Sequence, residues 1–145
     1  MPDNAELTML FVGDVYVRRA DPPSIFAHVA PLLREADVAF GNLEAPITDR
    51  GEPILGKPIA GVNFRSPPDA VSALTFAGFD AMGLANNHSM DFGASGRAQT
   101  VAALDRAGIA HTGFQPFGGF VVIELRVPRL DLGGAERESL PLRAP

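Results

Sequence analysis

The chain has 145 residues, a length that suits one domain with a buried core, and 46% of them are hydrophobic, too many for a disordered protein. The formal net charge is −5 and no run of Lys or Arg occurs, so neither a nucleic acid nor an anionic membrane is the expected partner. Cysteine is absent, which excludes disulfides, thiolate metal sites and a cysteine nucleophile, so any metal must be bound through oxygen and nitrogen.

No segment of the sequence reads as a membrane or export signal. The first apolar run, Met9 to Val12, is too short for the core of a signal peptide and lacks a positively charged flank. No apolar stretch approaches the length of a transmembrane helix. The chain as given is therefore expected to be soluble and cytoplasmic.

The first part of the chain predicts a strand, a helix and a second strand. Residues 7–12 are an apolar run that reads as a buried strand. Asp21-Pro22 is a helix start, and apolar residues follow at helical spacing as far as Ala36. Residues 37–40 read as the second strand. Residues 45–65 form a loop with three prolines and three glycines, and its length is typical of functional loops.

The next part continues the alternation. Residues 66–69 are predicted to be a capping box for a helix that stops at Gly78. A strand is predicted over 79–85, a helix over 95–107 with Gly108 as its stop, and a short strand over 109–112.

This alternation predicts an α/β fold with a parallel sheet and right-handed crossovers. Residues 120–125 are predicted to form one more strand, and the Pro- and Gly-rich residues that follow read as an irregular tail. The expected organisation is one partial domain over residues 1–127 and a tail over 128–145.

Polar residues follow three of the predicted strands. They are Gly13-Asp14, Asn42-Leu43-Glu44 and Asn86-Asn87-His88. Ligands bind at the carboxyl edge of open parallel sheets, so we expect Asp14, Glu44, Asn87 and His88 to share one cleft.

Each cluster alone is most often an ordinary turn, and a single histidine is more often a surface residue than a ligand. Three such turns on one sheet edge, with no Lys or Arg beside them, favour a metal site instead. Facing carboxylates need a cation, and carboxylate and amide oxygens suit hard divalent ions. Two such ions can activate water and hold a phosphoryl group, and a nearby histidine can protonate the leaving oxygen.

The sequence resembles the bacterial capsule-synthesis family linked to poly-γ-glutamate, a branch of the calcineurin-like metallophosphoesterases. The resemblance runs from about Met9 to Gly113. It rests on FVGDV, on ADVAFGNLEAPIT, on AGFDAMGLANNHSMDFG, and on the T-x-x-x-L-x-x-A-G-I segment that begins at Thr100.

The resemblance implies the fold and the roles of the site residues. The implied fold is an αββα sandwich, of which this chain carries the N-terminal half. Asp14, Glu44 and Asn87 match metal ligands for one or two Mn, Fe or Zn ions, and His88 matches the catalytic acid. Asp91 is expected either to orient His88 or to be a solvated loop carboxylate. Asn42 and Asn86 are expected to brace their turns through backbone hydrogen bonds.

The sequence also departs from the family pattern. Tyr16, a poor ligand, stands where the wider superfamily has a histidine, and His28 and His111 have weak claims as ligands. Nothing of the family is recognisable from Gln115 onward. Three hypotheses stay open: a metal-dependent phosphoesterase acting on a phosphoester or capsule-related substrate, a non-catalytic protein that binds metal weakly, and a half-domain completed by a second-half chain.

The predicted strands also suggest how the chain associates. The apolar strand residues alternate between the two faces of the sheet, and the three predicted helices can cover one face. The other face would lack a cover, which predicts a homo-oligomer, a complex with a second-half chain, or aggregation. The residues considered are Met9, Phe11, Val38, Phe40, Met82 and Leu84.

Overall fold

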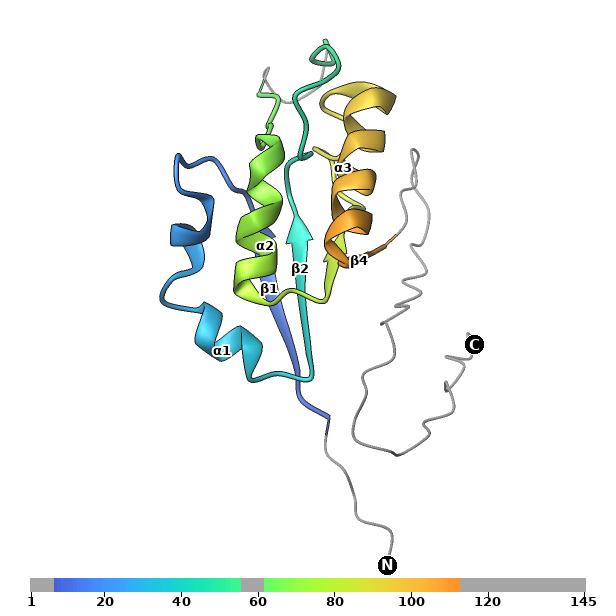
Figure 1. Ribbon diagram of the computed structural model, residues 1–145. Helices are drawn as coiled ribbons and strands as arrows, with labels where there is room; N and C mark the ends of the chain where they lie inside the picture. Colours follow the sequence, from blue (N-terminus) through green and yellow to red (C-terminus); the bar gives the residue numbers. More distant parts are fainter. Residues whose placement is uncertain (1–6, 56–61, 113–145) are drawn as a thin grey trace, which may run out of the picture.

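The computed structural model describes residues 7–55 and 62–112, which form a four-stranded sheet packed against helices (Figure 1). All strand pairs are parallel and the spatial order is β1-β2-β3-β4. The predicted α/β class with a parallel sheet is therefore confirmed for the described residues. The elements are β1 (Met9–Val15), a 3-10 helix η1 (Pro22–Phe26), α1 (Ala30–Arg34), β2 (Val38–Leu43), a 3-10 helix η2 (Pro68–Ala70), α2 (Val71–Ala77), β3 (Ala81–Gly83), α3 (Gly93–Ala107) and β4 (Ala110–His111).

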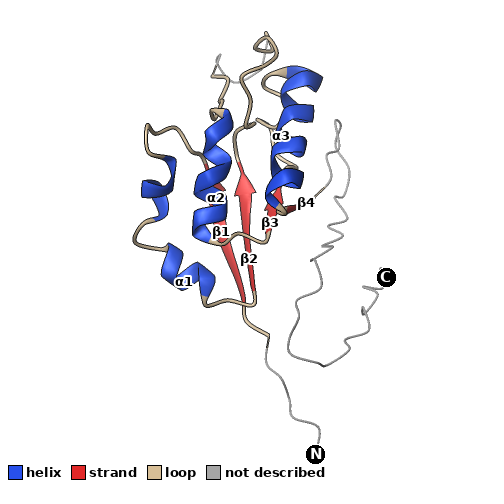
Figure 2. Cartoon of the chain, in the orientation of Figure 1, coloured by secondary structure: helices blue, strands red, loops and turns tan. Residues whose placement is uncertain are grey.

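The helices lie on one face of the sheet, as Figure 2 shows for α2 and α3. This follows from the strand order, because right-handed crossovers between successive neighbouring strands place every connecting helix on the same side. The side chains between the helices and the sheet form a buried apolar cluster; among its largest fully buried members are Leu43, Leu74, Met82 and Leu104. This layer is the hydrophobic core of the described residues.

Among the described residues, no helix lies over the opposite face of the sheet. Phe11 in β1 is 64% exposed and Met9 is 38% exposed. Phe11 is in register with Phe40, and the centroids of the two rings lie 5.7 Å apart. Of the six apolar strand residues considered above, Val38, Met82 and Leu84 are buried. On this face of the sheet, the exposed apolar surface is thus concentrated at β1 and at its contact with β2.

Two helix ends agree with the sequence. α2 ends at Gly78 and α3 ends at Gly108, and both glycines adopt the left-handed conformation with φ of 83° and 70°. Glycine reaches this conformation without the steric cost that a Cβ atom imposes, which explains why both helices stop there.

The helix expected to start at Pro22 is wrong as one element, because it is divided into η1 and α1. Pro31 lies in the first turn of α1 and has no N–H to donate to the preceding turn, so a helix that continued from η1 would be interrupted there.

The predicted capping box at Ser66 is also wrong. The N-cap residue is Pro67, and no side chain caps this helix. Ser66 instead forms a parallel bridge with Ile47, in which its N–H donates to the Pro46 carbonyl and its own carbonyl accepts from the Thr48 N–H. This bridge ties the two ends of the long loop to each other.

The strand predicted over residues 120–125 and the tail predicted over residues 128–145 lie outside the described residues. Across residues 7–55 and 62–112, no helix is both long and apolar enough to cross a membrane.

Candidate functional site

The polar residues predicted for the site lie at the carboxyl edge of the sheet. A register shift in β1 determines which of them are neighbours. Phe11 pairs with Phe40, but Asp14 rather than Gly13 pairs with Asn42. The extra residue in β1 is a bulge. Without it Asp14 would pair one residue later and its side chain would point to the other face of the sheet. Asp14 and Asn42 are therefore neighbours inside paired strands, not in the turns after them.

The side-chain amide of Asn42 links the clusters. Its Nδ2 donates to Asp14 Oδ1 at 2.7 Å and to Glu44 Oε2 at 2.8 Å, so one NH₂ group holds two carboxylates. Its Oδ1 accepts from Asn86 Nδ2 at 3.0 Å. The predicted brace for Asn42 through backbone hydrogen bonds is replaced by these contacts between side chains.

Asn86 does brace its turn. Its Nδ2 also donates to the Leu43 carbonyl at 2.8 Å, and its Oδ1 accepts from the His88 N–H at 3.0 Å. These bonds join the end of β2 to the turn after β3 and place His88 beside Glu44.

His88 lies between two carboxylates. Its Nδ1 is 2.7 Å from Asp91 Oδ2, and its Nε2 is 3.7 Å from Glu44 Oε1. Asp91 is fully buried, and its Oδ2 also accepts the Phe64 N–H at 2.6 Å. Asp91 is therefore not the solvated carboxylate of the alternative reading. An ionised carboxylate can only accept hydrogen bonds, so Nδ1 is assigned as the protonated nitrogen that donates to Asp91. The other ring nitrogen, Nε2, then faces Glu44.

Two aromatic rings cover His88. Phe64 stacks on the His88 ring at 4.1 Å between centroids, and Tyr16 stacks on Phe64 at 5.0 Å. Tyr16 therefore packs against Phe64, the ring that covers His88. The stack restricts the tilt of the imidazole, and the hydrogen bond to Asp91 fixes the direction of its nitrogens.

The other candidate residues lie elsewhere or at the rim. Asn87 is exposed in the same turn as His88. The amide that the structure places between Asp14 and Glu44 is that of Asn42. His28 is exposed, and His111 contacts Asp105 through Nε2 at 3.1 Å.

The donor set fits part of a metal site. Asp14 and Glu44 converge on one amide, and in the described residues neither forms an ion pair with a lysine or arginine. Converging carboxylates of this kind attract a hard divalent ion. In the described parts of the chain, however, no group of three or more His, Asp or Glu side chains is arranged to hold a metal. Asp14 and Glu44, with amide oxygens nearby, would thus supply some ligands, and a closed coordination sphere needs others.

Phe64 and the linking role of Asn42 are features that sequence reasoning missed. An aromatic residue near the end of a long loop rich in proline and glycine was the available signal for Phe64. The signal for Asn42 was its position two residues before Glu44, which puts both side chains on the same face of an extended strand.

Known proteins are similar to this chain over the residues that form the sheet and its carboxyl edge. Residues 8–117 match the model of the family described as bacterial capsule synthesis protein PGA_cap. The chain is 32% identical over 119 residues to capsule biosynthesis protein CapA of Bacillus anthracis, which covers 77% of this chain and 29% of that protein. It is 43% identical over 113 residues to protein y4uA of Sinorhizobium fredii, covering 73% of this chain and 24% of the relative. The chain thus spans about a quarter of the length of these curated relatives.

Proposed function

The chain belongs to the PGA_cap family of bacterial capsule synthesis proteins. We propose that it forms the amino-terminal part of a metal-dependent phosphoesterase-like site. The observation that carries the proposal is the position of His88, whose two ring nitrogens face Asp91 and Glu44. A histidine oriented by a buried carboxylate and turned toward a second acidic cluster has the arrangement expected of a general acid.

His88 moves the proton in this proposal. Asp91 accepts from Nδ1, which keeps the ring in one tautomer and makes Nε2 the nitrogen that exchanges a proton with the substrate. Phe64 and the turn braced by Asn86 hold the ring in place. The leaving oxygen of the substrate would then receive its proton on the side of His88 that faces Glu44.

Asp14 and Glu44 hold the metal in this proposal, and Asn87 is the further ligand that the family resemblance suggests. Asn42 sets the spacing of the two carboxylates through its shared NH₂ group. A bound Mn, Fe or Zn ion supplies a Lewis acid and lowers the cost of forming hydroxide from water. The substrate is proposed to be a phosphoester or a capsule-related molecule, since relatives are named for capsule and PGA biosynthesis.

Calorimetry and turnover test the proposal together. Titration of the full chain with Mn²⁺ should release heat that the Glu44→Gln variant does not release. Hydrolysis of p-nitrophenyl phosphate, if present, should fall by about 10²–10⁴-fold in His88→Ala, the usual scale for a general acid.

The outcomes separate the two roles. Equal, negligible heats from both proteins would refute the metal centre. Activity that is lost on chelation but unchanged in His88→Ala would keep the metal centre and remove His88 from the mechanism.

The uncovered sheet face favours a second candidate, a half-domain that functions only after pairing. The two-sheet αββα sandwich is proposed here because Phe11 and Met9 are exposed on the face that none of the described helices covers. A second sheet, from a second copy or a second-half chain, would cover them.

Light scattering tests the pairing. The Phe11→Ser variant should shift the mass of the purified protein toward that of the monomer. Leu32→Ser is the matched control, because Leu32 is 58% exposed but lies in α1 on the helical side. A monodisperse monomer for the unaltered chain would contradict pairing with a second copy.

A further inference from the structure

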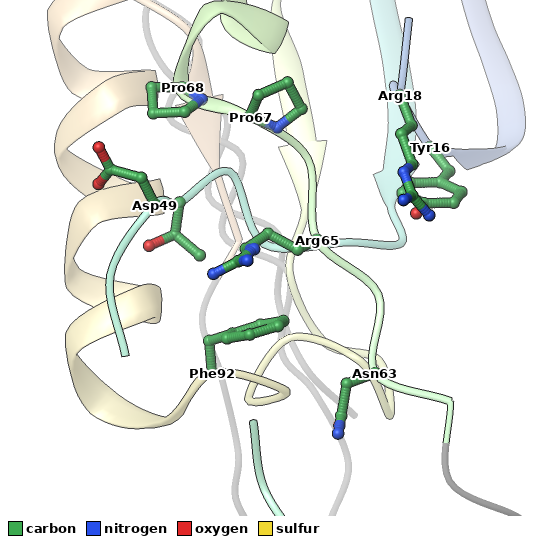
Figure 3. Close-up of a pocket in the computed structure, with 9 residues that line it drawn as sticks. Tyr16, Arg18, Asp49, Asn63, Arg65, Pro67, Pro68 and Phe92 are labelled. Atoms are coloured by element: carbon green, nitrogen blue, oxygen red, sulfur yellow. The ribbon is translucent and has the colours of Figure 1, made fainter. Parts of the chain in front are cut away.

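A cavity of about 500 Å³ lies next to the aromatic stack that covers His88. Figure 3 shows residues that line it. It is lined by Tyr16, Arg18, Thr48, Asp49, Asn63, Arg65, Pro67, Pro68 and Phe92. Asp14, Asn42 and Glu44 do not line it, so the cavity is distinct from the candidate metal site.

Two arginines place positive charge at the cavity. Arg18 lies beside Tyr16, while the guanidinium of Arg65 lies over the ring of Phe92, with its carbon 4.4 Å from the ring centroid. Within the described residues, neither arginine forms an ion pair with a carboxylate. Two unpaired guanidinium groups on one cavity are notable in a chain whose net charge is −5.

The acidic residue of the cavity is engaged elsewhere. Asp49 Oδ1 accepts from Gln99 Nε2 at 2.7 Å and lies 4.0 Å from Arg50 Nε. Its charge is therefore directed toward α3 and its own chain neighbour, and the described structure shows no contact between it and either cavity arginine.

Some residues that line the cavity also contact, or adjoin in the chain, the residues that position His88. Tyr16 lines the cavity and stacks on Phe64, which stacks on His88. Arg65 follows Phe64 in the chain. Phe92 likewise follows Asp91, the partner of His88. A molecule bound in the cavity therefore lies against the same loop and turn that position the histidine.

We propose that this cavity is an oxyanion subsite, in which Arg18 and Arg65 bind a carboxylate or phosphate group of an extended ligand. The planar fork of arginine matches both groups through paired hydrogen bonds, and the ring of Phe92 holds the Arg65 fork in position. The proposal rests on the proposed function in one respect: the remainder of the same ligand reaches the His88 site.

Binding of two small anions tests the subsite without turnover. The full chain, freed of metal on a chelating resin, is titrated by calorimetry at low salt with inorganic tripolyphosphate and, separately, with a peptide of three glutamates. At least one probe should bind with a Kd of about 1 mM or tighter. The arm that binds more tightly distinguishes a phosphate from a carboxylate ligand.

The variants assign the binding to the cavity. Arg18→Ala and Arg65→Ala should each weaken the better probe by roughly tenfold, the scale for losing a charge-assisted hydrogen bond. Arg106→Ala is the matched control, since it removes the same charge from the exposed end of α3 away from the cavity, and it should change the affinity by less than about twofold. Arg65→Lys should restore only part of the affinity, because a point charge lacks the planar fork.

The results decide the proposal independently of the metal site. It is overturned if neither probe binds, or if both arginine variants bind as the unaltered chain does. Glu44→Gln should keep the affinity for the probe while losing the heat of Mn²⁺ binding. Arginine-dependent binding in a chain that takes up no metal would leave the subsite standing and refute only the proposed function.

Discussion

Asp91 and Asp14 are chemically identical side chains of one site in opposite environments. Asp91 is fully buried, contacts His88 Nδ1 and accepts the backbone N–H of Phe64. Asp14 is exposed and shares the Asn42 amide with Glu44. The first carboxylate joins two segments distant in sequence, whereas the second sits at an open edge beside another negative charge.

The difference in burial predicts different roles for the two carboxylates. A buried carboxylate stays charged at acceptable cost only when hydrogen bonds satisfy it, so its removal leaves buried donors unpaired. Two carboxylates that share one donor, one exposed and one partly buried, gain little stability from it and remain suited to a cation. Asp91 should therefore govern stability and Asp14 should govern ligand binding.

The largest expected effect is on stability, in Asp91→Ala. Removing the acceptor of Phe64 N and His88 Nδ1 should cost about 3 kcal/mol of unfolding free energy. For a chain of this size the Tm should fall by roughly 10 °C, measured by circular dichroism. Asp91→Asn, which keeps an oxygen acceptor for Phe64, should lose about half as much. A Tm within about 2 °C of the unaltered chain for both variants would remove the distinction between the carboxylates.

A smaller effect is expected in Phe64→Ala, which removes the ring between Tyr16 and His88. Two stacked contacts worth about 0.5–1.5 kcal/mol each sum to about 1–3 kcal/mol, so the expected loss is about 2 kcal/mol, measured by denaturant unfolding. The NMR signals of the His88 ring should also lose the ring-current shift that a stacked phenyl group causes. Phe64→Leu is the control, because it keeps apolar bulk without an aromatic ring. Unchanged His88 signals in the alanine variant would show that the stack does not hold the histidine in solution.

The smallest effect on stability is expected in Asp14→Asn. The substitution removes one of two neighbouring negative charges and keeps an oxygen that accepts from Asn42, so unfolding free energy should change by no more than about 0.5 kcal/mol. Metal-free protein should be used, so that a bound ion does not add to the stability of the unaltered chain. A loss as large as that of Asp91→Ala would place Asp14 among the structural carboxylates.

Much of the architecture follows from local sequence patterns. Apolar runs, helical spacing and the stop glycines at Gly78 and Gly108 place the sheet and α3 close to where the structure has them. The same patterns failed where a backbone needs a partner distant in sequence. Ser66 pairs with Ile47 instead of capping a helix. The division of the first predicted helix has a different, local reason, which is Pro31 in the first turn of α1.

The sequence by itself determined which residues have the chemistry of the site and that parallel strands deliver them to one edge, because side-chain type and the alternation of strands and helices along the chain are local properties. Only the tertiary structure decided their geometry. The bulge that turns Asp14 toward Asn42, the burial of Asp91 and the closure of Phe64 over His88 each depend on contacts between distant segments. Register and loop closure are set by the packing of the whole sheet, so no short window of sequence contains them.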